Sequence, residues 1–329
     1  MPLYMVGRNT PPDENTDDQR IWWSVSDDGI FWAPMSEVPG ANTPTTPSLA
    51  SWKGRLYMAW RGVRASGVDD PALYWSVFDG SSWSSYQRFG DPDAIWRRSS
   101  FGPQLVARHD RLCMYWRGEK DGFGQPNKRV MVATFDGNTW SDGQSIMGGR
   151  AVSDIDIFVT DSNTSRVHLL AREGANNDNV LYWSQDGVSW NVNDRIILPH
   201  KSIGIPSLVG FPGFGTSTLM LTYIKNDNDQ VYGSSSSDNG RTWSPEAPVT
   251  GVRSNHPPRY ATWGSAQPFA VWRSPGHTYH QVFQARPATV REWWDPRTKR
   301  PTAPDSPPID GLVSYHQPVI AAYGSMLFD

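Results

Sequence analysis

The sequence predicts an all-β protein built from repeated four-stranded antiparallel units, and three observations carry this prediction. A Gly-x-x-Trp step recurs at a nearly constant spacing of about 50 residues. Short aromatic and β-branched segments between Lys-Gly and Asp-Gly turns are typical of strands joined by hairpins. No stretch has a helical period of useful length. The five steps are Gly29/Trp32, Gly80/Trp83, Gly137/Trp140, Gly187/Trp190 and Gly240/Trp243.

One unit serves as the template, and its strands are named A to D in chain order. They are expected at 47–52, 55–61, 72–78 and 82–86. Other units repeat the pattern, with B strands at 112–117, 167–172, 219–225 and 269–273, and C strands at 130–135, 180–184, 230–235 and 281–285. Such repeated units predict a β-propeller, in which each sheet is a blade packed on its neighbours around an axis.

The two ends of the chain supply the expected number of blades. Residues 3–8 match strand B of the template, so the first unit lacks its innermost strand, whereas residues 318–323 match strand A. We therefore expect a six-bladed β-propeller of four-stranded antiparallel blades, closed by the C-terminal strand completing the N-terminal blade. Closure would remove exposed strand edges. Residues 326–328 compete with 3–6 for the same B position, and the sequence leaves this choice open.

The domain prediction is a single β-propeller over 1–329, with an irregular proline-rich insertion at about 295–311. This insertion belongs to a longer irregular segment, 287–310, in the last connection between strands D and A. A connector and a lid over the central mouth are both open interpretations.

Composition argues against several kinds of function. The 30 basic and 33 acidic residues give a formal charge of −3, too small to hold nucleic acid or an anionic membrane surface. No apolar run approaches the roughly 20 residues of a membrane helix. Cys113 is the only cysteine, so we expect no intramolecular disulfide and a buried, inert thiol. His277 and His280 lack a third ligand, so neither a metal nor another cofactor is expected.

The N-terminal residues lack a basic leader followed by an apolar stretch. The expected location is therefore cytoplasmic, or secreted without a recognisable signal peptide. The sequence leaves the oligomeric state open.

One turn carries a specific motif, Ser236-x-Asp238-x-Gly240-x-Thr242-Trp243. It resembles the Asp-box (BNR) repeat of sialidases and of related propellers and lectins. Degraded versions stand at the other turns, and the first unit keeps Asp27, Gly29 and Trp32. In the families that carry this box, it lies on the face opposite the ligand site, so the resemblance implies a fold and not an activity.

A second recurrence points to a ligand site, because strand B ends in a cation in every unit. These cations are expected to ring the mouth, the face that bears the B-to-C loops and the D-to-A connections. An arginine and an acid can bind the hydroxyl groups of a sugar, and a tryptophan can stack on its ring. The alternative is that each cation pairs with acids or carbonyls of the adjoining loops. The candidate ligand-binding residues are Arg8, Arg61, Arg117, Arg172, Lys225, Arg273, Trp60, Trp116 and Trp272.

Most of the 17 tryptophans are expected to fill the gaps between blades. This is the ordinary role of large flat side chains in radially arranged sheets.

The sialidase resemblance implies three arginines, one of them from an Arg-Ile-Pro motif, together with a Tyr/Glu pair and an Asp acid/base. Here Arg8 is followed by Asn-Thr-Pro, so the sequence departs from that pattern at its most recognisable position. Asp154 and Asp156, at the start of an A strand, are the candidate catalytic acids, because one of two neighbouring carboxylates can have a raised pKa. Adjacent acids in a loop also form turns.

The leading functional hypothesis is a carbohydrate-binding, lectin-like propeller, similar to the six-bladed fucose-type lectins of fungi and bacteria. The ligand would be a glycan or a small molecule held by Arg and Trp groups at the mouth. The alternative is an enzyme with one central pocket on the axis, either a diverged sialidase-like glycosidase or a secondary-metabolite cyclase. A protein-interaction platform is a third interpretation. Stoichiometry separates the first two, since a lectin would bind several ligands per chain.

Overall fold

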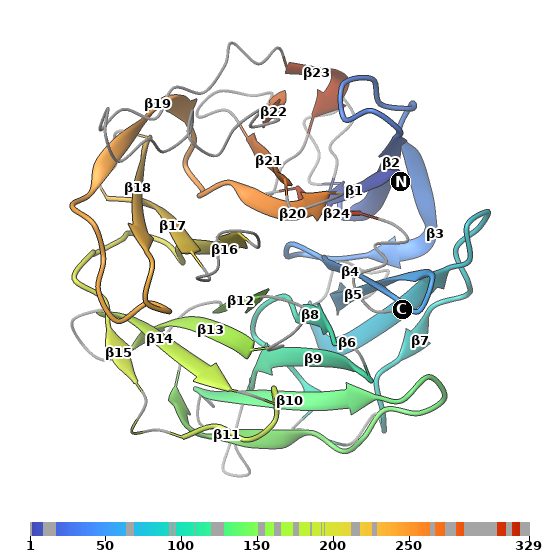
Figure 1. Ribbon diagram of the computed structural model, residues 1–329. Helices are drawn as coiled ribbons and strands as arrows, with labels where there is room; N and C mark the ends of the chain where they lie inside the picture. The colour runs from blue at the N-terminus through green and yellow to red at the C-terminus, as the bar shows by residue number, and fades with distance from the viewer. Residues whose placement is uncertain are drawn as a thin grey trace.

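The computed structural model describes residues 2–8, 18–63, 69–91, 94, 97–108, 110–119, 128–150, 155–160, 166–173, 178–184, 186–191, 193, 195–211, 218–225, 229–263, 267–273, 281–285, 308–313 and 318–322. Within these ranges the sheets are all antiparallel and radiate from one axis (Figure 1). The all-β propeller of four-stranded antiparallel blades is thereby confirmed.

The described strands form six four-stranded sheets, numbered here as blades I to VI with the strand nearest the axis first (Figure 1). Blade I contains β24 (Val319–Ala322), β1 (Leu3–Arg8), β2 (Arg20–Ser26) and β3 (Ser36–Asn42). Blade II contains β4 (Ser48–Trp52), β5 (Arg55–Val63), β6 (Asp69–Phe78) and β7 (Gln87–Arg88). Blade III contains β8 (Gln104–Ala107), β9 (Leu112–Arg117), β10 (Arg129–Phe135) and β11 (Gln144–Arg150).

The remaining three blades have the same order from the axis outward. Blade IV contains β12 (Ile155–Thr160), β13 (Arg166–Glu173), β14 (Asp178–Ser184) and β15 (Ile196–Ile197). Blade V contains β16 (Ser207–Phe211), β17 (Thr218–Ile224), β18 (Gln230–Ser236) and β19 (Ala247–Arg253). Blade VI contains β20 (Arg259–Trp263), β21 (Gln267–Arg273), β22 (Gln281–Ala285) and β23 (Pro308–Val313).

Strand β24 closes the ring by pairing with β1, with Leu3 opposite Ala322 and Val6 opposite Val319. The C-terminal strand thus occupies the innermost place of the N-terminal blade, as the sequence led us to expect. The competing segment 326–328 and most of the proline-rich segment 287–310 lie outside the described residues.

The core lies between the blades. Each boundary between neighbouring blades holds one cluster of buried apolar side chains contributed by both sheets. Cys113 belongs to the cluster between blades III and IV, and burial raises the pKa of its thiol to about 11, which keeps it protonated.

The C-to-D turns pack onto the preceding blade, and the turn at Gly240 shows how. Ser236 Oγ accepts the Gly240 N–H at 2.8 Å, and Trp243 Nε1 donates to the Gly240 carbonyl at 2.9 Å. Gly240 has a φ of +85°, and a Cβ there would lie 2.4 Å from Leu181 Cδ2 of blade IV. Only glycine therefore fits without strain.

In blade I the carboxylate that caps this turn is Asp28. Its Oδ1 accepts the N–H groups of Ile30 and Phe31 at 2.8 and 2.9 Å. Asp27, which the motif comparison selected, lies one residue too early. Among the described residues, no helix has the length and apolar character that crossing a bilayer requires.

Candidate functional site at the axial end of the inner strands

The innermost strands all begin at the mouth, because each runs antiparallel to a B strand that ends there. Strand pairing fixes which residues are equivalent, through their partners on the B strands. The first position near the axis is occupied by Ser48, Gln104, Asp156, Ser207, Arg259 and Val319.

Asp156 joins the inner strands of three blades. Its side chain is buried, with the residue 5% exposed, and Oδ2 accepts the N–H of Leu208 in β16 at 3.0 Å. Its Oδ1 accepts a hydrogen bond from Nη1 of Arg259 in β20, and the two side chains form an ion pair. These contacts connect blades IV, V and VI beside the axis.

One half of this arrangement recurs elsewhere in the ring. Ser48 Oγ accepts the N–H of Leu105 at 2.8 Å, which links the inner strands of blades II and III. An acceptor at the first position that binds the backbone of the next blade is thus a structural feature of the fold. The ion pair with Arg259 is an addition to this structural feature. A serine hydroxyl at position 156 would accept the Leu208 N–H equally well, without removing two charges from water.

The pair determines what this part of the molecule can do chemically. Both oxygens of Asp156 accept hydrogen bonds, one from the Leu208 N–H and one from Arg259, so this carboxylate orients Arg259, and a catalytic role for Asp156 stays a prediction. A guanidinium has five N–H donors in a rigid plane, which match hydroxyl pairs and carboxylates. The neighbouring Tyr260 hydroxyl lies 3.1 Å from Thr222 Oγ1, and burial raises its pKa, so the phenol stays neutral.

The register corrects the expected ring of cations. Arg8, Arg61, Arg117, Arg172 and Arg273 occupy equivalent positions, two residues beyond the partners of the first position. In blade V Ser207 pairs with Thr222, so Ile224 takes this place and Lys225 lies one residue further. Lys225 instead binds Glu246 and lies 5.8 Å from the ring centre of Tyr232.

The five arginines hold the D-to-A connections. Three donate to a backbone carbonyl of the connection that leads into the next blade: Arg8 to Pro44 at 3.2 Å, Arg61 to Ser99 at 2.8 Å and Arg172 to Ile203 at 2.9 Å. The other two contact the connection into their own blade, Arg117 over the Phe101 ring at 5.0 Å and Arg273 on Asn255 Oδ1 at 2.8 Å. These contacts support the structural alternative, and ligand binding by the five side chains stays a prediction.

The three tryptophans expected to stack on a ligand are core residues. Trp60, Trp116 and Trp272 are 2%, 0% and 3% exposed, and they lie in the clusters between blades. Side chains of these B-strand positions point at the neighbouring sheet. Their burial favours a packing role between blades, and ligand stacking by these three side chains stays a prediction.

Of the two candidate acids, Asp156 lies at the axis and Asp154 lies outside the described residues. In the part of the chain that the structure describes, no group of three His, Cys, Asp or Glu side chains could hold a metal ion. Sequence reasoning missed Arg259, although a signal existed: aligned A strands place opposite charges at Asp156 and Arg259, where Ser48 and Ser207 stand in other units.

Comparison with known proteins bears on the fold. Neither a protein-family model nor a curated protein sequence matches this chain. Solved structures do match. A Hadza microbial sialidase superposes with a TM-score of 0.57 at 16% identity over 80% of this chain, which spans 59% of that protein. An exo-β-1,3-galactanase from Phanerochaete chrysosporium, in complex with β-1,3-galactotriose, gives 0.57 at 12% identity, covering 84% of this chain and 67% of that one.

A protein of unknown function from Dyadobacter fermentans gives a TM-score of 0.53 at 13% identity, and the match covers 96% of this chain and 90% of that one. At these identities the similarity establishes a shared propeller architecture.

Proposed function

We propose that this protein binds carbohydrate at the axial end of its inner strands, with Arg259 contacting the ligand and Asp156 holding Arg259 in place. The observation that carries the proposal is the ion pair between the buried Asp156 and the partly buried Arg259, which joins three blades beside the axis. Desolvating two charges is costly and often brings no net stability, so the pair favours a role beyond packing.

Two considerations favour a sugar over other small ligands. A guanidinium whose position is fixed loses little conformational entropy when it binds vicinal hydroxyls or a carboxylate. Two of the similar propellers are, by name, a sialidase and a galactanase, the latter with a bound galactotriose. The likeness in fold supports the ligand class without specifying the glycan.

Burial also bears on the number of sites. Separate lectin sites between blades would need accessible tryptophans and uncommitted arginines, whereas Trp60 and Trp116 are core residues and Arg61 binds the connection ahead of it. We therefore propose one ligand per chain, a change from the several sites expected from the repeats.

A glycan array containing neutral and acidic sugars tests the proposal. Arg259→Gln should weaken binding of the best glycan by about 10- to 100-fold, the effect of losing a charged hydrogen bond. Arg241→Gln is the matched control, because Arg241 is exposed in a C-to-D turn on the opposite face. Binding that is equal in both variants refutes the site, and an array on which the native protein binds nothing refutes the function.

Arg259→Gln leaves the Asp156 carboxylate buried beside a neutral side chain, which destabilises the fold. The double variant Asp156→Asn/Arg259→Gln restores a neutral polar pair. It should fold like the native protein and bind the glycan about 10- to 100-fold more weakly.

The enzyme alternative uses the same axial position, and the names of the sialidase and galactanase neighbours favour it over a cyclase. Mass spectrometry of the best glycan after prolonged incubation separates binding from turnover. Unchanged glycan supports a lectin-like protein, and cleavage supports a glycosidase.

A further inference from the structure

Ser207 differs from the other buried serines in its hydrogen bonding. In the part of the chain that the structure describes, eleven serines are buried, and ten of them make a hydrogen bond through the side chain. Ser207 is 3% exposed, and its hydroxyl has no hydrogen-bond partner among the described residues. A buried hydroxyl without a partner is unfavourable, so this exception indicates a role beyond packing.

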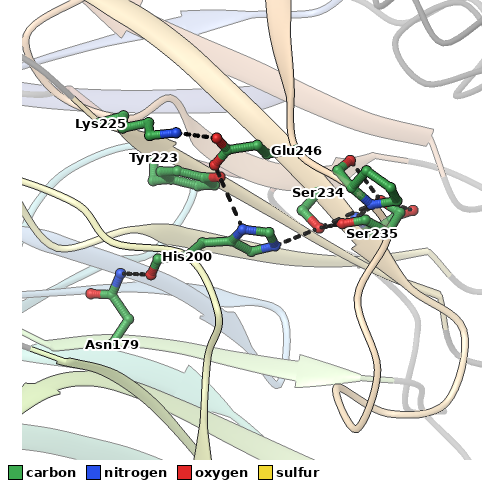
Figure 2. A network of polar contacts seen from close by, with 9 residues as sticks. Asn179, His200, Tyr223, Lys225, Ser234, Ser235 and Glu246 are labelled. Atoms are coloured by element: carbon green, nitrogen blue, oxygen red, sulfur yellow. Dashed lines mark hydrogen bonds and ion pairs between the residues drawn. The ribbon is translucent and has the colours of Figure 1, made fainter.

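Ser48 and Ser234 show how buried hydroxyls are used elsewhere in the fold. Ser48, at the equivalent position of blade II, accepts the Leu105 N–H of the next blade. Ser234 in β18 is 0% exposed, donates to the Ser244 carbonyl at 2.7 Å and lies 3.0 Å from His200 Nε2 (Figure 2). Both hydroxyls therefore serve the structure, whereas that of Ser207 makes neither kind of contact.

Ser207 begins β16 beside the ion pair of Asp156 with Arg259. The N–H of the following residue, Leu208, donates to Asp156 Oδ2 at 3.0 Å, and Arg259 binds the other oxygen of the same carboxylate. Consecutive Cα atoms are about 3.8 Å apart. Ser207 thus lies one residue away from the contact with the carboxylate that orients Arg259.

The side chain of Ser207 faces the blade that carries Arg259. Ser207 pairs with Thr222 across β16 and β17, and residues directly opposite each other project from the same face of a sheet. Thr222 Oγ1 lies 3.1 Å from the Tyr260 hydroxyl, so this face is the one toward blade VI. The exposed part of Ser207 includes its hydroxyl, because Oγ is not among the unpartnered side-chain atoms that are shielded from solvent.

We propose that the Ser207 hydroxyl is a ligand contact of the axial site and selects a ligand that presents a hydroxyl group there. This inference rests on the function proposed above and adds the chemistry of one contact to it. A guanidinium only donates hydrogen bonds, whereas a serine hydroxyl has one donor and two acceptor lone pairs. A sugar hydroxyl has the same combination, so it can pair with Ser207 and also accept from Arg259. A site built for such a hydroxyl rejects the deoxygenated analogue, which leaves the serine unpaired.

Thermal unfolding without ligand is the first test. Ser207→Ala removes a hydroxyl that has no partner, so its melting temperature should equal or exceed the native value. Ser234→Ala, the matched control, loses the contacts with His200 and Ser244 and should melt a few degrees lower. A loss in Ser207→Ala as large as that in Ser234→Ala would make Ser207 a structural residue and overturn the proposal.

A glycan array with galactose, glucose, mannose, fucose and sialic acid as terminal sugars is the probe for binding. Affinity for the glycan that the native protein binds best should fall by about 3- to 10-fold in Ser207→Ala and stay unchanged in Ser234→Ala. Among the monodeoxy analogues of its terminal sugar, one should bind the native protein about 3- to 10-fold more weakly than the parent glycan. Ser207→Ala should not distinguish that analogue from the parent.

The outcomes separate this contact from the function itself. Weaker binding in Arg259→Gln together with unchanged binding in Ser207→Ala overturns the Ser207 contact alone. A native protein and a Ser207→Ala variant that discriminate equally against every deoxy analogue also overturn it. A native protein that binds no glycan, or an Arg259→Gln variant that binds like the native protein, overturns the proposed function and this inference with it.

Discussion

His168 is a buried histidine that should make the protein sensitive to acid. It lies in β13, is 0% exposed, and neither ring nitrogen has a hydrogen-bond partner among the described residues. Burial, together with the Arg166 guanidinium, lowers its pKa to about 3. The equivalent positions of other blades, set by the strand pairing, hold Tyr57, Cys113 and Met220.

The size of the effect follows from linkage. An unfolded histidine has a pKa of about 6.5, so it binds a proton at pH 5 whereas the folded ring does not. With a folded pKa of about 3, the free energy of unfolding falls by about 2 kcal/mol between pH 8 and pH 5. The stabilisation is complete above the unfolded pKa and is lost as the pH falls toward the folded one.

His168→Met places the blade V residue at this position and removes the titrating group. The variant should lose about 2 kcal/mol less than the native protein between pH 8 and pH 5, and it should be more stable at pH 8 by about 1 kcal/mol, since an unpaired buried polar group is removed. Urea unfolding at both pH values measures the two quantities, with His256→Gln as an exposed-histidine control. Parallel losses in native protein and His168→Met would refute the reasoning.

Two further predictions concern the turns. Gly240→Ala should lower the free energy of unfolding by about 1–3 kcal/mol more than Gly54→Ala does. Both positions have positive φ, but only at Gly240 would the new Cβ lie 2.4 Å from Leu181 Cδ2. Equal losses would mean that the turn does not pack tightly against blade IV. Asp28→Ala should lower the melting temperature and Asp27→Ala should leave it nearly unchanged, because Asp28 accepts the two turn N–H groups; the opposite order in thermal denaturation would restore the motif alignment.

Local sequence signals located the strands and the hairpins. The turns need a residue with positive φ, and glycines such as Gly240 mark these places within a few residues of sequence. They could not decide between neighbouring residues. Asp27 and Asp28 differ only in which carboxylate reaches the turn, and Lys225 and Ile224 differ by one step of a strand register.

Long-range contacts explain the rest. The contact between Asp156 and Arg259 joins residues 103 positions apart, so no local sequence pattern predicts it. The tryptophans pose a related difficulty. In the sequence, Trp60 and Trp116 look the same whether the ring faces a groove or a neighbouring blade, and only the packing of two sheets distinguishes the two cases.

The axial site is tested most directly by counting the ligands that one chain binds. Native mass spectrometry with the best glycan from the array should show a single bound molecule at saturation, with an affinity about 10- to 100-fold weaker in Asp156→Asn/Arg259→Gln and unchanged in Arg241→Gln. Several molecules bound per chain, or a single one whose affinity the double substitution leaves unchanged, would place the binding surface elsewhere on the propeller.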